Sequence, residues 1–306
     1  MEIDANFMGE IYSVACTVMW AAAVVLFKKS GETVDPFSLN MFKNVLALVL
    51  FTPTVLLAGD SLFPADSAWS FGVLAVSGIL GISIADTLLF MCLNRLGASL
   101  TAIVDCMYAP SALFIAFVLF GEKIGTWTIV GAALIISAIL IGSLKRRDFK
   151  MKTGDLVAGI VYGALSMFFM AFGIVMIKKP IFGHEPVLEN QPLLWVTWFR
   201  LLAGTAAMVL VSLMLPKPGR FYTVFRFSAV WKTMVPASIL GTYLSMVVWL
   251  LGWKLIESAG VAAVLNQLTL IFVMIFAGVF LKEKIDLRKI LAVFMALAGG
   301  IITVLG

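Results

Sequence analysis

Apolar residues run through this chain in long blocks, separated by short stretches that hold Gly, Pro and charged residues. Most blocks approach the roughly 20 residues that a helix needs to cross a bilayer. A helix also satisfies its own backbone hydrogen bonds in hydrocarbon, where water cannot. The pattern therefore predicts an all-α integral membrane protein. The expected spans are 9–27, 37–58, 69–91, 98–120, 126–144, 155–177, 192–215, 232–253, 259–281 and 288–306.

The composition agrees with a lipid environment. Hydrophobic residues make up 62% of the chain and charged residues 13%, and the mean hydropathy is +1.07. Soluble domains are about one quarter charged. Almost nothing is left over for a soluble domain. The first ten residues hold Glu2, Asp4 and Glu10 but no Lys or Arg, so we expect the first helix to remain in the protein rather than to be cleaved as a signal peptide.

Two segments of the chain repeat each other. Residues 98–124 and 259–285 align without a gap at an offset of 161, with 7 identities in 27 positions, and both end in the residues Glu-Lys-Ile. Phe42-Lys43 likewise corresponds to Phe199-Arg200, and the region around Ser245 and Met246 corresponds to Asp86. A shared charged turn at a shared distance from an apolar run indicates a duplicated membrane unit.

A basic linker at 145–152 divides the chain into five expected helices and five expected helices. An odd number of spans in each half makes the two halves antiparallel. The predicted fold is therefore ten transmembrane helices in two inverted five-helix repeats, with the boundaries 1–147 and 148–306.

The segment 95–142 holds two expected helices. The first begins with small residues, has Pro110 near its middle and is followed by Gly-Glu, and the second is rich in glycine. In these features it resembles the drug/metabolite transporter superfamily with two EamA-type domains. The second half departs from that pattern, because Ile271 replaces the proline and Lys282 replaces the glycine before Glu283. The ninth span is therefore expected to be straighter than the fourth. The resemblance implies a ten-helix carrier that works by alternating access.

The charges outside the helices are strongly biased to one side. Sixteen Lys and Arg residues fall on the side away from the two termini, and four fall on the side of the termini: Lys123, Lys178, Lys179 and Lys254. The positive-inside rule then predicts a plasma-membrane protein with both termini outside the cytoplasm. The family resemblance implies the reverse orientation. Because the net charge of +5 serves topology, nucleic acid is not an expected partner.

Four ionisable residues lie well within apolar runs: Lys43, Asp86, Asp105 and Arg200. Each costs about 2.5 to 3.5 kcal/mol at the centre of a membrane helix, so it is expected to face a partner or a wet path. Lys43 can pair with one carboxylate, which leaves the other to bind a proton or substrate. Arg200 has no acid at its depth in the second half and is a candidate anchor for an anion. The structural alternatives are a Lys43 that reaches the interface, an Arg200 that packs on carbonyls, and a purely structural carboxylate pair.

Polar residues at helical spacing extend this set toward a path for substrate or protons. The candidate residues are Asp86, Asp105, Lys43, Arg200, Tyr108, Asn266, Gln267, Thr242, Ser245 and Trp20. For each hydroxyl taken alone, an interhelical hydrogen bond is an equally good explanation.

Small residues form two stripes, Ala292, Ala296 and Gly300 on the last helix and Ala138 with Gly142 on the fifth. Such stripes let helix backbones approach closely. We interpret both as packing faces or as faces of a homodimer rather than as substrate contacts.

The sequence favours no cofactor and no metal. Cys16, Cys92 and Cys106 fall in apolar runs as free thiols, and His184 is expected in a loop. The predicted function is secondary active transport of a small organic metabolite, an amino acid or similar amphiphile, with export and proton coupling favoured. The alternative carrier is a sugar-phosphate or nucleotide-sugar exchanger. An enzyme or scaffold is the alternative from another class, but the motifs HExxH, P-loop and GxSxG are absent from the sequence.

Overall fold

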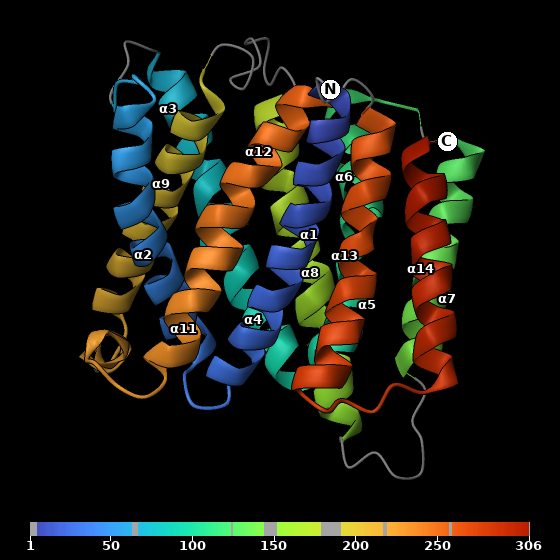
Figure 1. The fold of residues 1–306 in the computed structure, drawn as a ribbon. Helices are drawn as coiled ribbons and strands as arrows, with labels where there is room; N and C mark the ends of the chain where they lie inside the picture. The colour runs from blue at the N-terminus through green and yellow to red at the C-terminus, as the bar shows by residue number, and fades with distance from the viewer. Residues whose placement is uncertain are drawn as a thin grey trace.

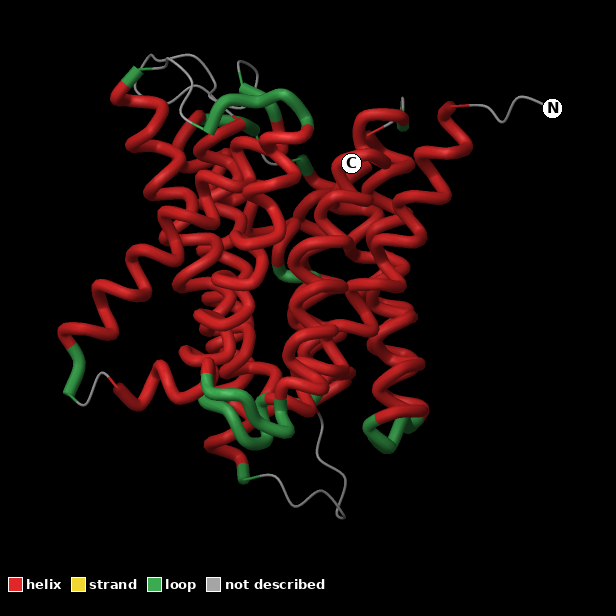
Figure 2. Tube along the Cα trace, turned by 60° about the vertical axis from the view of Figure 1, so that its left-hand side comes forward, coloured by secondary structure: helices red, strands yellow, loops and turns green. Residues whose placement is uncertain are grey.

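The computed structural model describes residues 5–62, 67–123, 125–143, 152–178, 191–216, 219–256 and 259–305. Over these residues the chain forms helices and no strand, and the long helices run side by side between two layers of loops (Figures 1 and 2). This confirms the all-α fold. The start of α1 and the end of α14 lie at one face, which we name the terminal face, and the opposite face is named the basic face (Figure 1). Residues 145–151 of the predicted 145–152 linker, and His184, lie outside the described residues.

The first half comprises α1 (Ala5–Ser30), α2 (Pro36–Leu57), α3 (Ala68–Gly78), η1 (Ile79–Ile84), α4 (Ala85–Leu96), α5 (Ala98–Asp105), α6 (Tyr108–Phe120) and α7 (Thr126–Ser143). The second half comprises α8 (Thr153–Lys178), α9 (Leu193–Met214), α10 (Gly219–Tyr222), η2 (Thr223–Phe225), α11 (Trp231–Ser238), η3 (Ile239–Leu244), α12 (Ser245–Leu255), α13 (Ala259–Phe280) and α14 (Leu287–Leu305). Among the described residues, 8 helical runs are long and apolar enough to cross a bilayer, and Leu265–Phe280 is a shorter apolar helix.

Proline and an acidic cap account for two local features of the helices. The Asp35 carboxylate accepts from the Ser38 backbone N–H at 3.0 Å, and Pro36 occupies the first turn of α2, which together fix the start of that helix. Pro110 cannot donate to the carbonyl of Cys106, and the fourth span is divided into α5 and α6 at this point. With Ile271 in place of the proline, α13 is one continuous helix. The expectation of a straighter ninth span is confirmed.

Both halves contain a six-residue π-helix in the middle of their third run. These are η1 and η3, and each begins with the residues Ile-Leu-Gly, 160 positions apart (239 − 79). A π-helix is rare, and it occurs mostly at functional sites because it bends the helix and leaves carbonyls without their usual partners. The same distortion at matching sequence positions supports a duplication.

The two halves touch at matching positions near the middle of the bundle. The Cys106 thiol contacts the Gln267 side-chain oxygen at 3.9 Å, and these residues are 161 positions apart, which is the offset of the repeat. At the basic face, Glu283 accepts hydrogen bonds from the backbone N–H groups of Ala98 at 2.6 Å and Ser99 at 3.1 Å. A carboxylate there stabilises the start of α5 because it meets unpaired amides at the positive end of the helix.

The small-residue stripes pack against each other inside the chain. Helices α7 and α14 lie side by side (Figure 1), and Ala138, Ala292 and Ala296 are fully buried. A Cβ on Gly142 would lie 3.3 Å from that of Ala292, and one on Gly300 would lie 2.9 Å from the Gln267 side chain. The stripes therefore serve close packing within one chain, which is the first of the two interpretations above.

The backbone of Lys282 adopts a strained, left-handed conformation. Its φ is 53°, and it is the only non-glycine residue with positive φ in the described part of the chain. Gly121, its counterpart in the first half, has a φ of 67°. Both residues follow the last turn of a helix, where a left-handed residue commonly ends it. A side chain in this conformation costs about 1 to 2 kcal/mol.

We therefore expect Lys282→Gly to stabilise the folded protein by about 1 kcal/mol, because glycine adopts this conformation without steric cost. Thermal unfolding in detergent should show a higher Tm. Lys284→Gly is the matched control, since it removes the same charge from an exposed residue of the same loop at which φ is not positive. An equal or larger rise in Tm for the control would contradict the strain argument.

Candidate functional site

A cavity of about 390 Å³ lies between the two halves. Its walls come from α1, α2, the η1–α4 segment and α6 of the first half, and from α8, α9 and the η3–α12 segment of the second. This volume falls within the range of small-molecule sites, which are about 300 to 1,000 Å³. Apolar side chains cover most of the surface, and a small number of polar groups enter it.

An ion pair from the first half lies at one end of the cavity. The Lys43 ammonium on α2 donates to the Asp86 carboxylate on α4 at 2.6 Å, and their side chains are 5% and 13% exposed. Asp86 is the second residue after the π-helix η1, whose bend sets the position of this residue. The pair that the sequence allowed for Lys43 therefore forms with Asp86. Its two charges cancel, which lowers the cost of holding them in a medium of low dielectric.

Arg200 on α9 reaches the same cavity without a comparable partner. Among the described residues, no ion pair or hydrogen bond involves its guanidinium, and its Nε is buried and unpaired. Two glycines of the third run make room for it. Gly78 lies against the Arg200 carbonyl oxygen, and a Cβ on Gly81 would lie 3.0 Å from Nη2. Asp86 and Tyr108 are within electrostatic range of the guanidinium, so its field extends over the polar end of the cavity.

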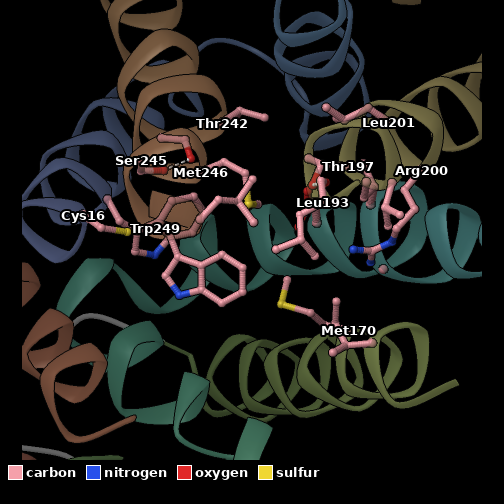
Figure 3. A pocket seen from close by; sticks show the side chains of 18 of the residues that line it. Cys16, Met170, Leu193, Thr197, Arg200, Leu201, Thr242, Ser245, Met246 and Trp249 are labelled. Atoms are coloured by element: carbon pink, nitrogen blue, oxygen red, sulfur yellow. Dashed lines mark hydrogen bonds between the residues drawn. The ribbon is translucent and has the colours of Figure 1, made fainter. Parts of the chain in front are cut away.

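The opposite wall of the cavity is formed by η3 and α12, facing α9 (Figure 3). The Thr242 hydroxyl is buried and unpaired, whereas the Ser245 hydroxyl donates to the Gly241 carbonyl at 2.5 Å. Met246 and Trp249 follow on the same helix, with Cys16 of α1 beside them (Figure 3). This wall is therefore largely apolar, and Thr242 is its available polar group.

The cavity is closed toward the basic face. There the ring centroid of Phe42 lies 5.2 Å from that of Trp231 and 5.5 Å from that of Phe225. The Ser30 hydroxyl also donates a hydrogen bond to the Thr233 hydroxyl at 2.8 Å. These five residues do not line the cavity. They join α1 and α2 of the first half to η2 and α11 of the second, so the two halves are held together on this side.

Toward the terminal face the cavity extends to the ends of two helices. Lys178, the last residue of α8, and Leu193, the first of α9, both line it, and Lys178 is exposed. The polar end therefore lies deep in the bundle, and the mouth lies on the side of the termini.

Seven of the ten candidate residues line this cavity: Lys43, Asp86, Arg200, Tyr108, Thr242, Ser245 and Trp20. Asp105, Asn266 and Gln267 do not. Asp105 is the carboxylate left over from the Lys43 pair. It lies about one turn nearer the basic face than Tyr108, and its Oδ1 is buried without a hydrogen-bond partner. It is thus separate from the cavity in this conformation.

Other lining residues escaped the sequence analysis. Met170 and Ile174 of α8 line the cavity, but an apolar residue in an apolar helix gives no signal of which way it faces. Thr197 could have been found, because it lies one turn before Arg200 on the same face. The repeated Ile-Leu-Gly could likewise have pointed to the two π-helices. Among the described residues, no group of three His, Cys, Asp or Glu side chains could hold a metal ion.

The fold and the cavity define the class as a multi-pass membrane protein with a small-molecule-sized central cavity between its two halves. The model of the EamA-like transporter family matches the chain twice, over residues 7–144 and 157–305. The chain belongs to the EamA-like transporter family, within the drug/metabolite transporter superfamily.

Similar proteins support the same class. Two proteins of Archaeoglobus fulgidus, each named "Uncharacterized transporter", are 21% identical over 295 residues and 26% identical over 298 residues. The first alignment covers 93% of this chain and 94% of the relative, and the second covers 94% and 92%. A solved structure described as "Crystal structure of protein" superposes with a TM-score of 0.66 at 16% identity, over 98% of this chain and 96% of the other. That likeness establishes the fold alone.

Asp86→Asn should strongly destabilise the protein, because it leaves the Lys43 ammonium buried without a counter-charge. Breaking one partner of a buried pair costs about 3 to 5 kcal/mol. Lys43→Met combined with Asp86→Leu should recover most of the loss, since no charge is then left unpaired. The measurement is the free energy of unfolding in mixed micelles. If the single and the double variant are equally destabilised, the pair does not act as a unit.

Proposed function

We propose that this protein is a secondary active transporter that moves a small organic metabolite across the plasma membrane by alternating access. The observation that carries the proposal is the cavity between the two halves, which is closed by aromatic packing at the basic face and reaches toward the terminal face. A carrier needs such a central site with access to one side at a time. Family membership supports the transport class.

The favoured substrate is an amino acid or a similar amphiphile, and export is the favoured direction. The cavity combines the Arg200 guanidinium and the unpaired Thr242 hydroxyl with large apolar side chains, which suits a molecule that has both a polar head and an apolar body. Exchange of sugar phosphates or nucleotide sugars is the second candidate, and Arg200 is the observation in its favour.

The proposal includes ten membrane spans in two inverted repeats. The two family matches, the matching π-helices and the contact between Cys106 and Gln267 support a duplicated unit. In an inverted pair the first and second halves exchange their conformations when the cavity changes sides. The closed contacts at the basic face would then have counterparts that form at the terminal face.

We further propose that both termini lie outside the cytoplasm, because the Lys and Arg bias between the two faces is sixteen to four. The conformation described here would then be open to the outside. A carboxy-terminal reporter that is active only in the cytoplasm should be silent, and the same reporter inserted in the 145–152 linker should be active. The reverse pattern would establish that the termini are in the cytoplasm and that the cavity opens inward.

The experiment that tests the carrier proposal is counterflow in proteoliposomes, with amino acids and related amphiphiles screened as substrates. At least one substrate should be accumulated against a preloaded unlabelled pool. Met170→Trp should abolish this flux, because the larger ring fills the cavity. Phe294→Trp is the control, since Phe294 is 65% exposed on the outer side of α14. Absence of counterflow across the whole screen would count against the proposal.

Proton coupling is assigned to Asp105. Its buried, unpaired Oδ1 fits a carboxyl that carries a proton in this conformation and loses it when the opposite face opens. Asn266 already occupies the repeat-related position, so Asp105→Asn is a conservative change. The variant should fold but lose the pH dependence of transport, and uphill flux should fall more than exchange. Transport like that of the wild type at every pH would remove Asp105 from the coupling mechanism.

A further inference from the structure

Lys43 and Arg200, which both line the cavity, occupy repeat-related positions, but their surroundings differ. Phe42-Lys43 on α2 corresponds to Phe199-Arg200 on α9. The partner of Lys43 is Asp86, the second residue after the π-helix η1. Met246 is likewise the second residue after η3. It comes 160 positions after Asp86 (246 − 86), and the two π-helices are separated by the same number of residues. The second half thus keeps the cation and replaces its acid with methionine.

We infer that this replacement makes the cavity a site for a single carboxylate: Met246 leaves Arg200 unpaired, and the carboxylate of the substrate takes the place that Asp86 holds beside Lys43. The inference rests on the proposed carrier function and names its substrate class, an organic monocarboxylate with an apolar body.

The charges in the cavity favour one negative charge over two. Lys43 and Asp86 neutralise each other at 2.6 Å, and Lys178 lies at the exposed mouth, where water screens it. Arg200 therefore supplies the unbalanced charge in the buried part. A guanidinium binds a carboxylate with two parallel hydrogen bonds. A phosphate monoester carries about −1.5 to −2 near neutral pH and would leave part of its charge uncompensated.

The remaining walls fit the rest of such a molecule. Trp20, Met170, Met246 and Trp249 offer large, polarisable surfaces to an apolar body. Thr242 adds one buried, unpaired hydroxyl on the wall that faces α9 (Figure 3), where a second polar group of the substrate can bind. The carboxylate end and the apolar end of the ligand are therefore recognised by different helices.

The test compares two matched probes, 3-phenylpropionate and its uncharged amide, with purified protein in nanodiscs. Binding is measured by isothermal titration calorimetry. The wild type should prefer the acid over the amide by roughly tenfold or more, because a hydrogen-bonded charge pair in a buried site is lost with the amide. Phenyl phosphate should bind more weakly than 3-phenylpropionate.

The decisive variant is Met246→Asp, which rebuilds in the second half the acid that the first half possesses. It should abolish the preference for the acid, because Arg200 then has an internal counter-charge. Met246→Asn has the same shape without the charge and should retain the preference, whatever its effect on overall affinity. A preference in Met246→Asp equal to that in Met246→Asn would overturn the inference, as would tighter binding of phenyl phosphate by the wild type.

If Met246→Asp does not yield folded protein, Arg200→Gln gives the same answer, since it should reduce the preference for the acid to about one. A retained preference would again overturn the inference. Binding and transport also separate this inference from the carrier proposal. Specific binding of the acid without any counterflow would overturn the carrier proposal alone, whereas counterflow of neutral solutes that is unaffected in Met246→Asp would overturn the assigned substrate class alone.

Discussion

The cost of holding charge in a medium that contains little water governs this structure. An ionised side chain near the centre of a membrane helix requires a counter-charge, hydrogen bonds or a wet cavity. Lys43 and Asp86 meet this requirement within the chain, at 2.6 Å. Arg200 forms no ion pair or hydrogen bond with a described residue, and the only carboxylate within its electrostatic range is Asp86, which is already paired with Lys43. The net positive charge of the cavity is therefore available to a bound molecule. The position of the cavity and the position of the unbalanced charge therefore coincide.

Helix irregularities bring these charges together. The π-helix η1 places Asp86 toward α2. Gly78 at the end of α3 lets the backbone of α9 approach closely, and Gly81 of η1 leaves room for the Arg200 side chain. A β-carbon at Gly78 would collide with the backbone of Arg200, so α9 could not pass this close if the position held any other residue. The equivalent distortion η3 shapes the opposite wall. The polar end of the cavity is thus built from backbone geometry as much as from side chains.

The sequence predicted the helices and the identity of the buried charges, because hydropathy and the cost of charge act locally along the chain. It also predicted that the ninth span is straighter than the fourth, from Ile271 and Pro110. It did not predict that Asp105 would lie apart from the cavity while Asp86 lines it. That difference depends on how α5 rotates and packs against its neighbours, which depth along a helix cannot reveal. The apolar wall from α8 was missed for the same reason.

The differences between the two halves are as informative as their likeness. If the halves were identical, the cavity would hold two neutral ion pairs and no unbalanced charge. Met246 stands in the second half where the first half has Asp86, and Asn266 stands where it has Asp105, so the second half lacks both carboxylates. At Gly121 and its counterpart Lys282 the residue type differs but the backbone does not, since both residues adopt a left-handed conformation. The backbone plan is thus common to both halves, while these two carboxylates are lost within apolar helices, where an unmatched charge has its greatest effect on what the protein can bind.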